Sequence, residues 1–200
     1  MEQHKNTFNQ ILTVFSYFFL LNVMWALLCL PVITAFPATT AMFGTVRKWI
    51  REGFDVGIFH VFFQLFKENF KKSFVIGLFW IIAVVILYLD IYIIFQNEFT
   101  GRSLLVALLF FFGIIVAFTT LYVFFVLVHY ELSIFHTLKN SLFLSISHMN
   151  FTVLFIGMIL LTLVITYYFP FFLLIGGSLL AFSMYGTFHK LIKKLDEMKA

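Results

Sequence analysis

Residues 28–43, LCLPVITAFPATTAMF, carry two prolines, Pro31 and Pro37, within a long run that has no Asp, Glu, Lys or Arg. About 20 apolar residues cross a bilayer as a helix, so we expect a first span over about 11–34. Proline ends a helix, or occupies its first turn where the missing N–H costs little. The stretch therefore predicts an elbow that leads into a second helix over about 38–51, along the membrane surface.

The start of that second helix is a candidate ligand site. Thr34 is placed to act as the N-cap, and Pro37 falls in the first turn. Thr39 and Thr40 follow, beside free backbone N–H groups and the positive end of the helix dipole. Such a place suits an anion, for instance a lipid phosphate or a ligand carboxylate. The alternative is structural, a capped elbow that turns the chain.

The composition indicates an integral membrane protein. Hydrophobic residues make up 62% of the 200 positions and charged residues 11%, whereas soluble domains average about 45–50% and about 25%. A soluble fold of this size could not cover so much apolar surface. The net charge of +4 is typical of cytoplasmic loops and does not indicate nucleic acid as a partner. The single cysteine, Cys29, excludes an internal disulfide and a CxxC motif.

Later apolar segments predict an all-α polytopic bundle that fills one membrane domain, 1–200. The uncharged window 149–188 is too long for one helix, and Pro170 divides it. A re-entrant hairpin over this window is the alternative to two spans. The expected spans are about 11–34, 73–95, 103–128, 150–168 and 171–188.

Basic residues predict the orientation of these five spans. Three regions that fall on one side carry Arg47, Lys48, Arg51, Lys67, Lys71, Lys72, Lys139, Lys190, Lys193, Lys194 and Lys199. The other side carries Lys5 and Arg102. Because cytoplasmic loops are enriched in Lys and Arg, we expect the N-terminus outside and the C-terminus in the cytoplasm.

Two further segments, about 55–72 and 134–149, have the pattern of amphipathic helices on the cytoplasmic surface. In the first, Phe59, Phe62, Phe63, Phe66 and Phe70 share one face, which could enter lipid or pack on the spans. In the second, the apolar face holds Phe135, Leu138, Leu142, Ile146 and Met149. The tripeptide Ile-Phe-His opens both segments, so a span–helix–span unit could be duplicated in parallel.

Few residues have the spacing that catalysis needs. His129 and His136 share a helix face, but Glu131 does not stand beside them as in an HExxH site, so no metal is expected. No G-x-S-x-G motif, Walker motif or Gly-rich phosphate loop is present. We expect a protein without enzymatic activity or cofactor. Polar residues within spans are costly, which makes Asn22 and Asp90 candidates for a site or for helix contacts.

One set of residues resembles the YesL-like family of small bacterial membrane proteins. The family shows a similar LNxxW…LPxxTxxP…TxA signature, followed by a basic, Phe-containing segment. The matching residues here are Leu21, Asn22, Trp25, Pro31, Val32, Thr34, Pro37, Thr40, Ala41 and Phe43. The basic segment corresponds to Phe66–Lys72, with Lys67, Asn69, Lys71 and Lys72 as candidate interfacial residues.

The resemblance implies a multi-pass protein of the bacterial plasma membrane with unknown biochemical function. Family members look associated with carbohydrate uptake and degradation, beside sugar ABC-transporter components. We therefore expect an accessory or regulatory component of oligosaccharide uptake or degradation, with membrane lipid and such components as partners. The alternative is a small transporter or a lipid- or anion-binding membrane protein. The sequence does not fix the oligomeric state.

Overall fold

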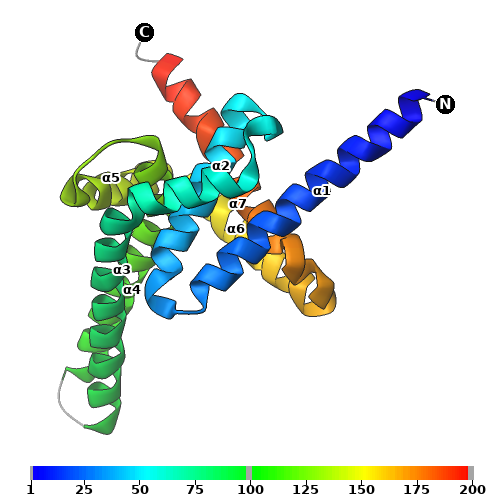
Figure 1. The fold of residues 1–200 in the computed structure, drawn as a ribbon. Helices are drawn as coiled ribbons and strands as arrows, with labels where there is room; N and C mark the ends of the chain where they lie inside the picture. Colours follow the sequence, from blue (N-terminus) through cyan, green and yellow to red (C-terminus); the bar gives the residue numbers. More distant parts are fainter. Residues whose placement is uncertain (1, 98–100, 198–200) are drawn as a thin grey trace.

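The structure is a computed structural model that describes residues 2–97 and 101–197, and these ranges contain helices and turns but no strand. The all-α prediction is confirmed (Figure 1). The elements in chain order are α1 (Glu2–Cys29), η1 (Val32–Thr34), α2 (Ala35–Glu52), η2 (Phe54–Val56), α3 (Ile58–Gln96), α4 (Arg102–His129), α5 (Ile134–Ser147), α6 (Met149–Tyr168), η3 (Pro170–Phe172) and α7 (Leu173–Glu197).

The predicted elbow is present between α1 and α2. A 3₁₀ turn follows Pro31, and α2 then begins at Ala35. The ring of Phe18 packs edge-on against Trp49, whereas Trp25, further along α1, donates its indole N–H to Thr39 near the start of α2. The earlier residue of α1, Phe18, pairs with the later residue of α2, Trp49, and the later residue, Trp25, pairs with the earlier one, Thr39. The two helices therefore run antiparallel.

The prediction that α2 lies along the membrane surface was wrong. It is the central helix of the bundle, with a continuous buried run from Pro37 to Val46 apart from the half-buried Thr39. Ala38 and Ala41 are fully covered, and the Gly44 position lies against Leu65 of α3. These small residues let neighbouring helices approach closely. Packing therefore takes α2 back through the bundle and not along its surface.

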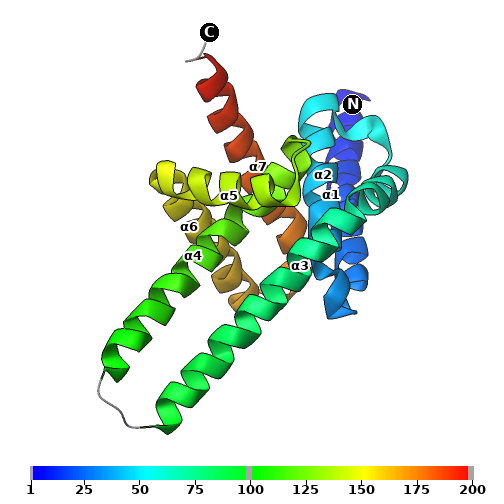
Figure 2. The same ribbon diagram turned by 90° about the vertical axis from the view of Figure 1, so that its left-hand side faces the viewer.

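The predicted boundary near residue 72 does not interrupt the helix, because α3 runs continuously from Ile58 to Gln96. Figures 1 and 2 show that its first part crosses α2 and its second part forms a long hairpin with α4. The two alternatives for the phenylalanine face both apply in part. Phe62 is completely buried against the core, whereas Phe59 and Phe63 are exposed.

The remaining helices follow the sequence prediction. The expected spans 103–128, 150–168 and 171–188 correspond to α4, α6 and α7, with α7 continuing to Glu197. The break at Pro170 is present as η3. Five helices, α1, α3, α4, α6 and α7, are long and apolar enough to cross a membrane.

Helix α5 lies across the end of the α3–α4 hairpin (Figure 2), and its polar face is buried. Thr137, Ser141 and Ser145 are buried, whereas Phe135 and Ile146 of the predicted apolar face are exposed. A hydrogen-bond chain holds this face in place: Thr152 of α6 donates to the Ser145 carbonyl oxygen, and its own hydroxyl lies 3.2 Å from that of Tyr122 in α4. The apolar face of α5 is thus left open to the surroundings.

The two ends of the chain lie at the same end of the bundle, whereas the sequence analysis expects them on opposite sides of a membrane (Figures 1 and 2). Helix α1 is antiparallel to both α2 and α7, because Phe18 contacts Phe182 while Asn22 contacts Leu173. The beginning of α1, the α2–α3 turn, α5 and the end of α7 share one end, and the elbow, the α3–α4 turn and η3 point the other way (Figures 1 and 2). The physical reason is the return of α2 through the core, which reverses the chain once more than the five candidate spans do.

The basic residues gather at the first of these ends, which we call the basic end; Arg102, at the start of α4, lies at the other. The proposed parallel repeat stays a prediction. Its first unit contains α2 between α1 and α3, whereas its second unit has only the short segment Tyr130–Ser133 between α4 and α5.

Candidate functional site

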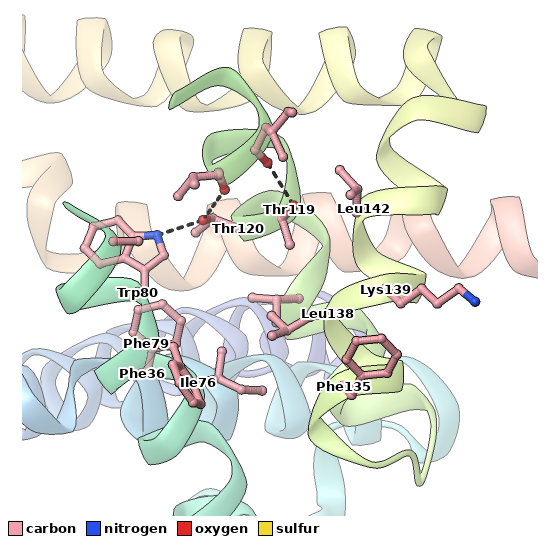
Figure 3. Close-up of a pocket in the computed structure, with 14 residues that line it drawn as sticks. Phe36, Ile76, Phe79, Trp80, Thr119, Thr120, Phe135, Leu138, Lys139 and Leu142 are labelled. Carbon is pink, nitrogen blue, oxygen red and sulfur yellow. Dashed lines mark hydrogen bonds between the residues drawn. The ribbon is translucent and has the colours of Figure 1, made fainter. Parts of the chain in front are cut away.

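An open apolar groove of about 460 Å³ lies between α3, α4 and α5, and we call it the lipid-facing groove. Its lining residues are Phe36, Ile76, Phe79, Trp80, Ala83, Ile115, Val116, Thr119, Thr120, Val123, Phe135, Leu138, Lys139 and Leu142. Figure 3 shows Phe36, Phe79 and Trp80 on one side of it and Phe135, Leu138 and Leu142 on the other. The groove exists because α5 crosses the α3–α4 hairpin with its apolar face turned outwards.

The polar side chains of Trp80, Thr119 and Thr120 inside the groove already have hydrogen-bond partners within the protein. Trp80 donates its indole N–H to the Thr120 hydroxyl over 2.9 Å, and Thr120 donates to the Val116 carbonyl oxygen over 2.7 Å. Thr119 donates to the Ile115 carbonyl oxygen over 2.8 Å. With these groups satisfied, the groove offers an apolar surface to a ligand.

Lys139 is the one charged residue among those that line the groove. Its side chain is exposed and points away from Trp80 in Figure 3, so its ammonium group lies at the rim. A rim cation above an apolar floor suits an amphipathic molecule with an anionic head and an apolar tail. The sequence analysis did not select this site, although Trp80 and Thr120, two polar-tipped residues within expected spans, were a signal for it.

Asn22 joins two helices and does not line the groove. Its Nδ2 donates to the Leu173 carbonyl oxygen over 2.7 Å, and its Oδ1 accepts from the Ser178 backbone N–H over 3.1 Å. Gly177 makes this possible, since a Cβ there would lie 2.6 Å from Oδ1 of Asn22. Both ends of the buried amide are therefore used to hold α1 against α7.

The elbow residues are also held by internal contacts. Thr34 occupies the N-cap position of α2, but its hydroxyl donates to the carbonyl oxygens of Leu28 and Pro31, which closes the end of α1. Thr40 donates to the Phe36 carbonyl oxygen over 2.9 Å. Pro37 is buried and has no N–H to offer, and Thr39 accepts from Trp25. These contacts give the anion hypothesis no support, and they fit the structural alternative.

The other candidates lie apart from the groove. Asp90 is half-exposed on α3, with no polar partner among the described residues. Lys71 and Lys72 are exposed, and Asn69 donates to the Leu65 carbonyl oxygen within its own helix. Lys67 borders a shallow surface depression with Phe59, His60, Phe63 and Gln64.

The histidines do not gather as metal ligands. Within the described part of the chain, no three His, Cys, Asp or Glu side chains are grouped in a way that could hold a metal ion. His136 is exposed on α5, whereas His129 lies with its Nδ1 3.1 Å from the Tyr185 hydroxyl. His129 and His136 therefore have different surroundings, although their spacing in the sequence would place them on one helix face.

Comparison with known proteins identifies the family. A model described as "Protein of unknown function, DUF624" matches residues 18–91. The uncharacterized protein YesL of Bacillus subtilis (strain 168) is 32% identical over 181 residues, which cover 88% of this chain and 85% of YesL. The chain belongs to the YesL-like family. The uncharacterized protein YteU of the same organism is 33% identical to this YesL-like protein over 138 residues, 69% of the chain and 62% of YteU. No solved structure matches it.

The structure gives the family signature a physical meaning. In this YesL-like protein Asn22 binds α7, Trp25 binds Thr39, and Thr34 closes the end of α1. Leu21, Ala41 and Phe43 are buried in the same core, where α1, α2 and α7 meet. The signature therefore describes how the elbow folds back and packs, and the lipid-facing groove lies largely outside it.

Proposed function

We propose that this YesL-like protein is a non-enzymatic lipid-binding membrane protein whose lipid-facing groove holds one acyl chain of an anionic phospholipid. The groove itself supports this most directly: it is apolar, open, and built from the sides of helices long enough to span a bilayer. In a bilayer, the medium that meets such a surface is hydrocarbon. An acyl chain fits it without leaving a polar group unpaired.

The position of Lys139 supports an anionic head group. Helix α5 lies at the basic end, so the rim of the groove is at the level where head groups meet the protein (Figure 2). A lysine near the membrane surface favours an anionic lipid by about 1 kcal/mol. Asn22 is occupied by α7 and Asp90 does not line the groove, so their positions favour lipid binding over the transport alternative.

Filling the groove is expected to release the bound lipid. In Ala83→Phe the new ring would occupy space that the acyl chain needs, because Ala83 lines the groove. We expect native mass spectrometry of the purified protein to show phosphatidylglycerol bound to the natural chain in preference to phosphatidylcholine, and severalfold less of it in this variant.

Leu108→Phe is the matched control, since Leu108 is 56% exposed on α4 and does not line the groove. It adds a ring to the same hairpin and should retain the lipid. Equal lipid retention by both variants, or no retained lipid in the natural chain, would exclude the groove as a binding site.

We also propose, on the family resemblance, that the protein acts as an accessory or regulatory component beside a sugar ABC transporter. The exposed surface of the α3–α4 hairpin favours a partner. The most apolar part of α4 has no buried residue. Its side chains Phe110 and Phe111 are 72% and 63% exposed. Such a surface meets either lipid or the helices of another protein.

This second proposal predicts co-purification with a sugar-transporter permease. We expect an affinity-tagged chain to retain the permease in mild detergent, and the double variant Phe110→Ala and Phe111→Ala to lose it, because large side chains dominate such contacts. Phe59→Ala, at an exposed phenylalanine outside the hairpin, should retain the permease. An unchanged rate of sugar uptake and normal regulation in a deletion strain would contradict the accessory role.

A further inference from the structure

Three helices bring basic and aromatic side chains together at the basic end of the bundle. Arg47 comes from α2, His129 from α4, and Tyr185 and His189 from α7. Tyr185 is completely buried, and its hydroxyl lies 3.1 Å from Nδ1 of His129 and beside the guanidinium group of Arg47. The ring of His189 stacks on that of Tyr185, with centroids 6.4 Å apart. We call these four residues the basic junction.

The basic junction contains buried polar atoms that no described residue satisfies. Nε of Arg47 and Nδ1 of His189 are buried and have no hydrogen-bond partner. Arg51, one turn further along α2, adds a second positive charge within electrostatic range of Tyr185. A buried polar atom without a partner is rare in folded proteins and calls for an explanation.

The directions of the hydrogen bonds at the basic junction indicate the chemistry of a ligand that would fit there. A guanidinium group only donates, so the Tyr185 oxygen accepts from Arg47, and the hydroxyl proton is available to Nδ1 of His129. Nε–H of Arg47 is buried without a hydrogen-bond partner, and Arg51 adds a second positive charge nearby. A group that would satisfy them is an acceptor that carries negative charge.

We propose that the basic junction is a binding site for a phosphate group. The planar fork of a guanidinium group matches phosphate oxygens, and two arginines one turn apart can hold a tetrahedral anion between them. The approach runs over the exposed Arg51 and the partly covered side chains of Arg47, His129 and His189, and Nε of Arg47 lies buried behind it. The site shares no residue with the lipid-facing groove, so it does not rest on the proposed function. The phosphate group could belong to a lipid head group at this end or to a free phosphate.

The experiment uses the full chain in dodecyl maltoside micelles, which contain no phosphate group, with inorganic phosphate titrated against chloride at constant ionic strength. Tryptophan fluorescence reports the midpoint of thermal unfolding. We expect phosphate to raise the midpoint of the natural chain, since a ligand that binds only the folded state stabilises it. For Arg47→Gln we expect an apparent Kd at least about tenfold weaker, because a charge-assisted hydrogen bond is lost.

Two further variants separate binding from folding. Tyr185→Phe keeps the packed ring and removes the hydroxyl that positions Arg47, and it should weaken binding by roughly threefold to tenfold. Lys48→Gln removes the same charge from the next position of α2, outside the basic junction, and should change the apparent Kd by less than about twofold. Without phosphate, Arg47→Gln should unfold at the same midpoint as the natural chain or higher, because an uncompensated charge has been removed.

Nanodiscs that contain phosphatidylglycerol identify the source of the phosphate group. If a lipid head group fills the basic junction, native mass spectrometry will show a phosphatidylglycerol adduct that Arg47→Gln loses, and free phosphate will no longer raise the midpoint. If free phosphate is the ligand, its effect will persist in these discs. The proposal is overturned if neither phosphate nor phosphatidylglycerol stabilises the natural chain, or if Lys48→Gln weakens binding as much as Arg47→Gln.

Discussion

Gly77→Ala is expected to lower the free energy of unfolding by about 3 kcal/mol, at the upper end of the usual cost of overpacking. A Cβ at Gly77 would lie 2.9 Å from both Cβ and Cγ of Phe36. Because Cβ of Phe36 is fixed to the backbone of α2, no change of rotamer moves it away. Helices α2 and α3 must then separate, which loosens the contact that places α3 beside the core. Reversible unfolding in sodium dodecyl sulfate, followed by circular dichroism, measures the effect.

Gly113→Ala and Gly157→Ala are the matched controls for this substitution. Both glycines stand within membrane helices, and nothing lies within 4 Å of a Cβ added there. Alanine favours a helix over glycine by roughly 0.5–1 kcal/mol, so these variants should be as stable as the natural chain or slightly more stable. If Gly77→Ala unfolded at the same detergent fraction as Gly113→Ala, the close approach of α2 and α3 would be contradicted.

The elbow could be predicted from the sequence, but the direction of the helix after it could not. Pro31 and Pro37 mark the turn within an uncharged run, and proline chemistry is local. The path of α2 depends on distant partners, such as Gly77 of α3 beside Phe36. The elbow alone predicted a helix along the membrane surface, whereas burial of its turns by other helices makes α2 central.

The candidate sites were less predictable than the fold for a related reason. The Trp80–Thr120 hydrogen bond joins residues 40 positions apart, and the Asn22–Leu173 bond joins residues 151 apart. A polar residue in a span predicts that some partner exists, but not which one. The sequence analysis therefore named Asn22 as a candidate for a site or for helix contacts, and the structure shows the helix contacts. It did not select the lipid-facing groove or the basic junction.

Both ends of the chain are expected to lie on the cytoplasmic side of the membrane. In a Cys29→Ala background, Gln3→Cys and Lys190→Cys should be protected from a membrane-impermeant maleimide in intact cells, whereas Ser103→Cys should react. Gln3 and Lys190 lie in α1 and α7 toward the basic end, and Ser103 follows the α3–α4 turn at the opposite end (Figure 2). The positive-inside rule places the basic end in the cytoplasm.

The position of Gln3 decides between the two topologies, because Lys190 and Ser103 have the same placement in both. If the chain reversed only at its five candidate spans, Gln3 would lie outside and Gln3→Cys would react. The additional return of α2 through the core puts Gln3 on the same side as Lys190. The labelling of Gln3→Cys in intact cells should be either complete or absent, because the end of a helix lies on one side of the bilayer or on the other. Labelling after the cells are permeabilised confirms that each cysteine is accessible. Reaction of Gln3→Cys in intact cells, together with protection of Lys190→Cys, would contradict the antiparallel contacts of α1 with α2 and α7.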